Sequence, residues 1–398
     1  MNPDLDKLQS YPFEKLATLK RGLTPPAELR HIALSIGEPK HATPAVITQS
    51  LTKYLDGLGV YPTTRGIEPL RQAIADWLNQ RFNLTVKPIR ADDQVLPVNG
   101  TREALFAFAQ AMVDADLEPL VMMPNPFYQI YEGAAYLAGA TPYFMDCRAE
   151  TGYLPDFNAI AEADWQRCQL VYICSPGNPS GAVMPFEQVR QLIELSDKYD
   201  FVIASDECYS EIYFDEKQPP VGLLQVCDQL GRADYCNCVV FHSLSKRSNA
   251  PGLRSGFVAG DADIIRGFFQ YRTYHGCAMP VQHQQASIAA WQDEAHVHHN
   301  RQLYQQKFAK VIEILQPHLP VKMPDAAFYL WLETPLPDEE FSQKLFAEKN
   351  VTVLPGSYLS RENQGFNPGQ NHVRIALVAE MDECLEAAQR IAAFCANL

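Results

Sequence analysis

The sequence predicts an α/β protein with a large, mainly parallel central sheet, flanking helices and a second, smaller α+β domain. A chain of 398 residues is too long for one ordinary hydrophobic core, so we expect two domains. Between about residue 93 and residue 260, short and fully apolar strands alternate with helices, which is typical of a parallel sheet buried on both faces. From about residue 280 the pattern changes to long helices and then to shorter mixed elements, which indicates the smaller domain.

We place the domain boundaries from these changes of pattern. Residues 1–45 are expected to form an N-terminal arm that contributes to the small domain, residues 46–285 the large domain, and residues 286–398 the small C-terminal domain. The arm is rich in proline, with a short helix predicted around 12–21 and an apolar strand at 32–36 that ends at Gly37. A glycine at this position allows the backbone to pass close to a ligand, although it is also an ordinary turn residue.

The remaining elements follow from periodicity and from runs of apolar residues. In the large domain we expect helices at about 43–55, 69–82, 128–138 and 185–199 and one opening at 99–103, with strands at 95–98, 120–123, 141–145, 170–174, 201–204, 238–241 and 256–259. In the small domain we expect helices at 282–295, 297–315, 339–349 and 382–396 and strands at 328–332, 351–354 and 372–378.

Composition excludes several classes of function. The net charge is −14, from 33 basic and 47 acidic residues, which argues against a nucleic-acid partner. No run approaches the roughly 18 apolar residues that a membrane span requires, and the polar, acidic N-terminus does not resemble a signal peptide. The ten cysteines lack metal-ligand spacing, so we expect reduced cysteines in a cytoplasmic enzyme and no metal site.

The polar residues that follow the predicted strands are the candidates for a site, because ligands gather at the carboxyl ends of strands in open α/β sheets. After 95–98 come Gly100, Thr101 and Arg102, whose backbone amides at a helix start would seat a phosphate or simply form an N-cap. After 120–123 comes Tyr128, which either stacks on a flat ring or packs in the core. The chain contains neither a P-loop nor a G-x-G-x-x-G motif, so a nicotinamide cofactor is not supported.

Two further strand ends carry groups that suit an aromatic cofactor. The loop after 170–174 has two prolines and two glycines around Asn178, which fixes the side chain as a hydrogen-bond donor or else marks a tight turn. Asp206, after 201–204, needs a positive partner if it is buried, and a protonated pyridine nitrogen would serve. Tyr209 could then bind a phenolic oxygen, while a helix N-cap is the alternative role for Asp206.

The stretch after the strand at 238–241 is the most specific. It places Ser243 and Ser245 beside Lys246, with Arg254 eight positions later and a Pro-Gly pair between them that prevents a regular helix. This arrangement suits a Schiff-base lysine next to a phosphate, although a surface lysine is the ordinary alternative. In the small domain, Arg374 lies in an apolar strand, where its planar fork would match a carboxylate of a substrate or of an internal salt bridge.

Taken in this order, these groups resemble the class I/II aminotransferases, pyridoxal-phosphate enzymes of fold type I, over nearly the whole chain. The resemblance implies that Lys246 binds the cofactor and acts as general base and acid, and that Asp206 pairs with the pyridine nitrogen. It implies that Tyr128, where the family often has tryptophan, stacks on the ring, with Phe127 as a possible substitute. It also implies that Asn178 and Tyr209 bind the phenolic oxygen, and that Gly37, Asn178 and Arg374 bind the substrate. The residues implied to bind the phosphate are Gly100, Thr101, Arg102, Ser243, Ser245 and Arg254. In a homodimer with shared sites, Tyr61 would bind the phosphate of the neighbouring subunit.

A narrower resemblance lies in two stretches, MNPDLDKLQSYPFEKL at the start and LSIGEPKHATP at 34–44. They resemble the N-succinyldiaminopimelate aminotransferases of bacterial lysine biosynthesis, which implies glutamate as amino donor and N-succinyl-2-amino-6-oxopimelate as acceptor. The succinyl arm would then need a ligand, for which the candidates are Arg21, Arg65, Arg272 and His275. The alternatives are an aminotransferase for aspartate, alanine or aromatic substrates, a fold-type I lyase, and a non-catalytic effector-binding module, which the short acidic arm argues against.

Overall fold

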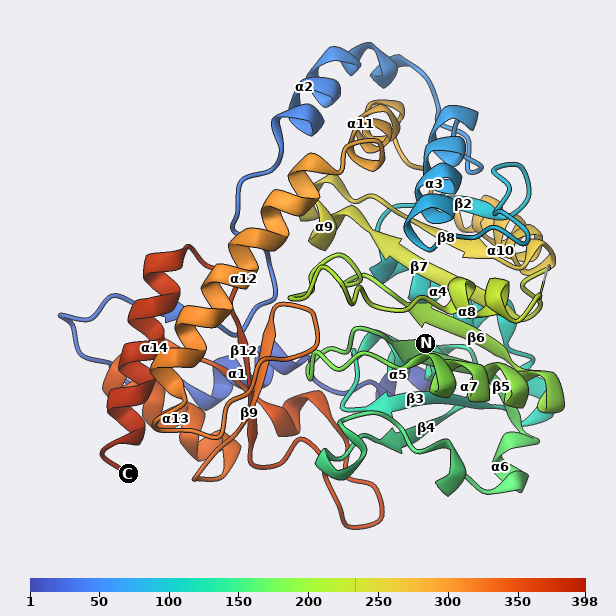
Figure 1. Ribbon diagram of the computed structural model, residues 1–398. Coiled ribbons are helices and arrows are strands. Elements are labelled where there is room, and N and C mark those ends of the chain that lie inside the picture. The colour runs from blue at the N-terminus through green and yellow to red at the C-terminus, as the bar shows by residue number, and fades with distance from the viewer. Residues whose placement is uncertain (233) are drawn as a thin grey trace.

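The computed structural model describes residues 1–232 and 234–398, and it contains a seven-stranded central sheet (Figure 1). The order across the sheet is β2 (Val95–Val98), β8 (Gly256–Gly260), β7 (Cys238–Ser243), β6 (Val202–Asp206), β5 (Cys168–Cys174), β3 (Leu120–Asn125) and β4 (Thr141–Asp146). The strands from β7 to β4 are mutually parallel, whereas β8 runs antiparallel to both β7 and β2. The mainly parallel sheet that the apolar strands predicted is therefore confirmed.

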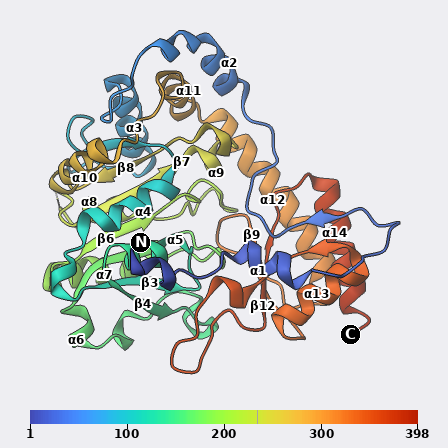
Figure 2. The same cartoon turned by 180° about the vertical axis from the view of Figure 1, so that it is seen from behind.

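Helices cover both faces of this sheet, which explains why its strands are apolar on both sides. One face packs against α3 (Glu68–Arg81), α7 (Phe186–Tyr199), α8 (Leu223–Gln229) and α11 (Val281–Trp291), with the short α6 (Glu162–Trp165) at its edge. The other face packs against α4 (Thr101–Met112), α5 (Ile130–Leu137) and α10 (Ala262–His275), and Figure 2 shows it from behind.

The small domain lies beside the large one and contains the C-terminus (Figure 1). Its antiparallel sheet has the order β11 (Leu354–Pro355), β12 (His372–Ala376), β9 (Tyr329–Glu333). These strands share one core with α12 (Ala295–Leu315), α13 (Asp338–Lys349) and α14 (Met381–Cys395). The N-terminal arm joins this domain because β1 (Ile32–Ala33) pairs in parallel with β10 (Val351–Thr352). The boundaries at residues 45 and 285 stay predictions.

The arm and the connections contain the remaining short elements. They are α1 (Pro12–Leu19), α2 (Ala45–Lys53), α9 (Leu244–Arg247) and the 3₁₀ turns Pro3–Lys7, Leu55–Gly59, Ala115–Leu117, Ala149–Thr151, Phe157–Ala159, Pro251–Leu253 and Gly356–Leu359. Within the two described ranges, no helix combines the length and the apolar character that crossing a membrane requires. The cytoplasmic location expected from the sequence stays a prediction.

Several predicted boundaries are wrong. The strand expected at 351–354 is split at Val353, because β10 pairs with β1 whereas β11 pairs with β12 in a different sheet. The strand expected at 372–378 ends at Ala376, and the helix expected at 282–295 ends at Trp291. Helices α8 and α10 were not predicted, although Asp261 caps α10 by accepting hydrogen bonds from two backbone N–H groups.

The sheet brings the predicted strand ends to one edge. Cys174 at the end of β5 is in register with Asp206 at the end of β6. Ser243 at the end of β7 faces Gly256, which in turn faces Val98 at the end of β2. The groups that follow β2, β5, β6 and β7 therefore share one edge of the sheet.

Gly256 makes this close pairing possible and gives a test of the packing. An alanine Cβ at this position would lie 2.5 Å from the backbone oxygen of His242, which cannot move without shifting β7. We expect Gly256→Ala to lower the free energy of unfolding by about 2 kcal/mol in urea titrations. The matched control is Gly267→Ala on the exposed face of α10, where a Cβ meets nothing within 4 Å and should raise stability by about 0.5–1 kcal/mol. Equal stability of the two variants would contradict this packing.

Candidate active site

A cavity of about 400 Å³ opens at this edge, between the sheet, the small domain and the N-terminal arm. Most of the residues singled out from the sequence line it, namely Gly37, Thr101, Arg102, Tyr128, Asn178, Asp206, Tyr209, Ser243, Ser245, Lys246, Arg254 and Arg374. Gly100 lies directly behind this lining, because a Cβ there would overlap Nη2 of Arg254. The structure thus brings together residues from seven separate stretches of the chain.

Lys246 lies in the short helix α9, immediately after β7. Ser243 caps this helix, since its Oγ accepts a hydrogen bond from the Ser245 N–H at 3.0 Å. The Lys246 ammonium donates to the backbone oxygen of Gly37 and lies 5.3 Å from the ring centre of Phe328. Burial lowers the pKa of Lys246 to about 8, and the charges of Arg374 and Arg254 act in the same direction. A substantial fraction of this amine is therefore neutral near pH 8.

Asp206 is buried, with 4% of its surface exposed. Its Oδ2 accepts a hydrogen bond of 2.7 Å from the hydroxyl of Tyr131, and its Oδ1 accepts one of 3.3 Å from the backbone N–H of Cys208. Burial raises the pKa of Asp206, and these hydrogen bonds act in the opposite direction. Both donors are neutral, so in the part of the chain that the structure describes the carboxylate accepts hydrogen bonds but forms no ion pair.

An anion seat is formed where α4 begins and where β7 ends. Gly100 adopts a φ of +84°, which L-residues rarely adopt, and it turns the chain into the first N–H groups of α4. The hydroxyls of Ser243, at the end of β7, and Ser245, in α9, lie 2.9 Å apart. Arg254 adds a cation against Gly100, with its Nη1 held at 2.9 Å by the backbone oxygen of Pro251. Amides, hydroxyls and a guanidinium in this arrangement match a phosphate.

Arg374 lies in β12, and the two oxygen atoms that accept hydrogen bonds from its guanidinium do not belong to carboxylates. Its Nη1 donates to Oδ1 of Asn178 at 2.8 Å, and its Nη2 donates to the backbone oxygen of Ser35 at 2.7 Å. The guanidinium lies 4.4 Å from the ring centre of Tyr329, and its buried Nε has no hydrogen-bond partner. Within residues 1–232 and 234–398, Arg374 therefore forms no internal salt bridge of the kind considered from the sequence, which leaves the guanidinium charge available to a bound carboxylate.

Tyr209 and Asn178 lie beside these groups. The Tyr209 hydroxyl is 2.9 Å from that of Tyr329, and burial raises the pKa of Tyr209 well above its usual value. This phenol therefore stays protonated and can donate. The Oδ1 of Asn178 already accepts from Arg374, which leaves its NH₂ group as the donor available to a ligand.

Sequence reasoning missed several residues that line this cavity or lie behind its lining. Tyr131 supplies the hydroxyl on Asp206, and its ring stacks on Tyr172 at 4.7 Å with 9° between the planes. The only signal was its position three residues after Tyr128, and an aromatic in an alanine-rich helix is normally a core residue. The arm also contributes Tyr11, Pro12 and Phe13, which no periodicity indicated. The other lining residues that were not predicted as site residues are Ile36, Gln129, Cys174, Cys208, Pro251, Tyr329 and Leu359.

Some predicted residues do not reach the cavity. Tyr61 is almost fully exposed, at 97%, and lies outside the lining. None of the four candidates for the succinyl arm, Arg21, Arg65, Arg272 and His275, is among the described residues that line it. Arg272 is instead buried and paired with Glu103 at 2.7 Å. Ligand atoms of Glu103, His275 and Cys277 lie within 4.8 Å of one another, as in a possible metal site. The one carboxylate of this cluster, Glu103, is already paired with the guanidinium of Arg272.

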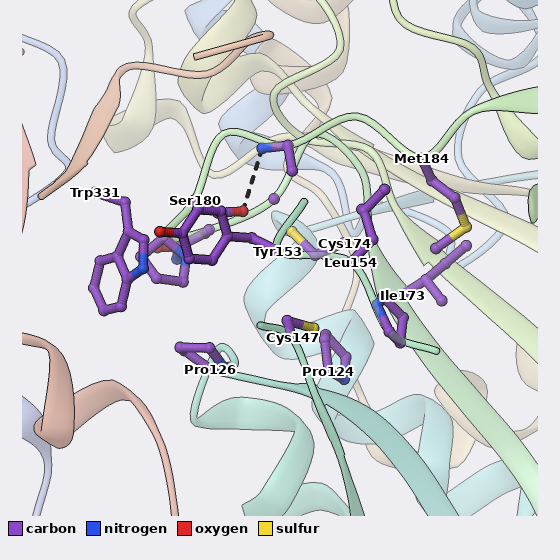
Figure 3. A pocket seen from close by; sticks show the side chains of 15 residues that line it. Pro124, Pro126, Cys147, Tyr153, Leu154, Ile173, Cys174, Ser180, Met184 and Trp331 are labelled. Carbon is purple, nitrogen blue, oxygen red and sulfur yellow. Dashed lines mark hydrogen bonds between the residues drawn. The ribbon is translucent and has the colours of Figure 1, made fainter. Parts of the chain in front are cut away.

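A second cavity lies next to the first, and both are lined by Cys174 and Asn178. Figure 3 shows its mainly apolar walls, which include Tyr153, Met184 and Trp331. Ser180 accepts the hydrogen bond drawn there, from the backbone N–H of Ala182 at 3.2 Å. This bond stiffens the loop that carries Asn178.

Comparisons with known proteins agree with this geometry. The LL-diaminopimelate aminotransferase of Maridesulfovibrio salexigens is 31% identical over 90% of both chains, and the 4-dedimethylamino-4-oxo-anhydrotetracycline transaminase OxyQ of Streptomyces rimosus is 32% identical over 97% of this chain and 99% of its own. The crystal structure of an aminotransferase from Neisseria meningitidis is 49% identical, with a TM-score of 0.95 over 99% of this chain and all of that one. The aminotransferase AspB from Helicobacter pylori is 33% identical, with a TM-score of 0.89 over 98% and 100%.

These relatives are not named for the N-succinyl substrate that the two N-terminal stretches suggested, so that narrower resemblance is not supported by their names. The broader one is. A family model for aminotransferase class I and II matches residues 30–391. The chain therefore belongs to the class I and II aminotransferases, the pyridoxal-phosphate-dependent enzymes of fold type I.

Proposed function

We propose that this aminotransferase exchanges an amino group between glutamate and the keto form of a diaminopimelate-type amino acid, in lysine biosynthesis. The observation that carries the proposal is one cavity that combines a lysine amine of lowered pKa, a buried carboxylate, an anion seat and an arginine with no carboxylate partner. Two forms of the substrate are candidates. The names of relatives favour free LL-diaminopimelate, and the N-terminal stretches favour N-succinyl-LL-2,6-diaminopimelate.

The residues present fit pyridoxal phosphate. Asp206 forms no ion pair among the described residues, so its charge suits a protonated pyridine nitrogen. Gly100, Ser243 and Arg254 would hold the phosphate at the anion seat, where a side chain on Gly100 would displace the guanidinium. Tyr128 lines the same cavity, and it would cover the ring. The Lys246 amine would bind the cofactor covalently.

When bound, the cofactor supplies an electron sink that stabilises negative charge at the α-carbon of the substrate. Arg374 would hold the substrate α-carboxylate through its fork and so direct the α-proton at Lys246. Lys246, in its neutral form, would remove that proton and return it, acting first as general base and then as general acid. Tyr209 and the NH₂ group of Asn178 would donate to the phenolic oxygen, and Asp206 would hold the proton on the ring nitrogen.

We further propose that the enzyme is a homodimer in which Tyr61 completes the neighbouring site. The segment from residue 54 to 61 supports this, because it exposes an unusual run of large apolar side chains, Tyr54, Leu55, Leu58, Val60 and Tyr61. A second copy packed on this segment would remove it from water. It would also explain why Tyr61 reaches nothing in its own chain's cavity.

A spectral titration tests the substrate. The purified protein, saturated with pyridoxal phosphate, is mixed in turn with glutamate, LL-diaminopimelate and N-succinyl-LL-2,6-diaminopimelate while its near-ultraviolet and visible absorbance is followed. We expect the yellow band to bleach with glutamate and with at least one of the two diaminopimelate compounds, and 2-oxoglutarate to form from glutamate. Bleaching with glutamate alone would reject the diaminopimelate assignment. No bleaching with any amino acid would reject aminotransfer.

The lowered pKa of Lys246 predicts how cofactor capture depends on pH. Only the neutral amine reacts with the cofactor's carbonyl, and an ordinary lysine reaches half neutrality near 10.5, whereas Lys246 does so at about 8. The rate of reconstitution of the cofactor-free protein should therefore rise with pH and level off above about 8. Absorbance in stopped flow measures this rate, and Lys246→Ala is the control that should form no covalent adduct. A rate that keeps rising to pH 10 would contradict the lowered pKa.

Tyr131 is a positioning residue for Asp206 in this proposal. Tyr131→Phe removes the hydroxyl that donates to the carboxylate at 2.7 Å while the ring can remain stacked on Tyr172. A hydrogen bond to a charged group contributes about 1.5–3 kcal/mol, so we expect kcat to fall by at least tenfold. The matched control is Tyr172→Phe, which loses a hydroxyl bound to the backbone oxygen of Leu105 at 2.6 Å. Both variants should lose thermal stability, and equal kcat in the two would show that Tyr131 is only structural.

A further inference from the structure

A third cavity, of about 440 Å³, lies apart from the active site. One of its walls is α3, through Asp76, Trp77 and Arg81, and the other is the end of α11 with the turn after it, through Trp291 and Glu294. Both helices cover the face of the sheet opposite to α4 (Figure 1). Among the described residues, this cavity shares none of its lining with the active-site cavity, and the proposed function does not use it.

Two carboxylates of this lining are accessible and only half engaged. Oδ1 of the exposed Asp76 accepts a hydrogen bond from Gln72 at 2.8 Å, and Oε1 of Glu294 accepts one from Nη2 of Arg247. In the described part of the chain, the second oxygen of each carboxylate accepts none. The Glu294 side chain is 52% exposed. The two groups therefore offer free acceptors that carry negative charge, which suit ammonium groups.

Arg81 supplies the opposite charge at the same cavity. Its Nε donates to Oε1 of the buried Glu211 at 2.7 Å, and its Nη2 donates to the backbone oxygen of Ser210 at 3.3 Å. These bonds fix the guanidinium, whose side chain is 12% exposed. Its Nη1 donates to no atom of residues 1–232 or 234–398, so this group can bind a carboxylate.

Two tryptophan rings form the apolar part of the wall. The ring centres of Trp77 and Trp291 lie 4.8 Å apart with 48° between the planes, and the residues are 5% and 2% exposed. Neither of the buried Nε1 atoms has a hydrogen-bond partner among the described residues, and a donor left unpaired away from water costs free energy. A ligand with an apolar stem and acceptor oxygens is complementary to such a wall.

Arg247 connects this cavity with the active site. It directly follows Lys246 in α9, it is 2% exposed, and its Nη2 donates to Glu294. Its guanidinium carbon lies 5.4 Å from the ring centre of Trp77 and 4.9 Å from that of Trp291. The carboxylate and the two rings that line the cavity therefore also hold the residue next to the active-site lysine.

We propose that this cavity binds a basic α-amino acid, and that Glu294 and Arg247 connect the bound ligand to Lys246. The two ammonium groups of such a ligand would meet Asp76 and Glu294, its alkyl stem would lie on the indoles, and its carboxylate would meet Arg81. Two carboxylates and one guanidinium in the lining leave one negative charge in excess, which complements the positive charge of the ligand. The binding goes beyond the proposed function, because it needs no part of the active-site cavity.

Titration calorimetry with L-lysine as the probe tests the site. The protein is loaded with pyridoxamine phosphate, so that no amino group passes to the cofactor. We expect L-lysine to bind about fivefold more tightly than L-norleucine, which lacks the side-chain ammonium, and Asp76→Asn to weaken L-lysine about threefold. Asp263→Asn, which breaks an exposed ion pair on α10, and Arg374→Lys should leave its Kd unchanged.

Equal binding of L-lysine and L-norleucine would overturn the proposal. So would an affinity for L-lysine that depends on Arg374 and not on Asp76, because the probe would then lie in the active site. Both outcomes are independent of whether the enzyme transfers amino groups, so they are distinct from a failure of the proposed function.

Glu294→Gln tests the connection to Lys246 without a ligand. The variant keeps the shape of the side chain but weakens its hold on Arg247, so Lys246 should be positioned less well. In stopped-flow reconstitution with pyridoxal phosphate, the limiting rate above about pH 8 should fall about threefold, while the pH of half-maximal rate stays the same. Glu187→Gln, in an exposed ion pair on α7, is the matched control and should change neither. A limiting rate equal to that of wild type would overturn the connection.

Discussion

The charge of Asp206 is the constraint on which the rest of the site depends. A carboxylate at the end of a buried strand is costly unless a cation balances it, and hydrogen bonds from Tyr131 and from the Cys208 backbone only reduce that cost. The same exclusion of water lowers the pKa of Lys246, because burial disfavours its ammonium form. One physical condition, burial at the strand ends, therefore produces both a buried carboxylate and an amine of lowered pKa, the two groups that the proposed function assigns to the ring nitrogen and the carbonyl of the cofactor.

Arg374 extends this arrangement across the two domains. Its guanidinium belongs to β12 of the small domain, yet it is held by Asn178 of the large domain and by the backbone of Ser35 in the arm. A substrate carboxylate bound there would therefore contact a group on which three parts of the chain converge. Because Asn178 is also a predicted ligand of the cofactor, the loop between β5 and α7 links the two binding events through one amide.

The sequence allowed the strand ends to be predicted because the strands are short, apolar and parallel. Asp206, Lys246 and Arg374 were found by this reasoning, since each follows or lies within an apolar run whose direction the fold class fixes. Tyr131 was not, because an aromatic in an alanine-rich helix gives the same pattern whether it packs in a core or holds a carboxylate. The split of 351–354 was also missed, since a four-residue apolar run does not specify its partner strand.

The wall of the cavity that the N-terminal arm forms could not be predicted for a different reason. Tyr11 and Phe13 come from an arm without periodicity, and only tertiary packing places them at the cavity, where Tyr11 lies against Arg102. Membership of the family leaves the substrate open, because two relatives that are 31% and 32% identical to this chain are named for unrelated substrates, a diaminopimelate and a tetracycline precursor. A shared fold with a shared cofactor fixes the chemistry at the α-carbon of the substrate, but it does not fix which substrate groups several bonds away are recognised. Discrimination between substrates must then come from groups that do not contact the cofactor.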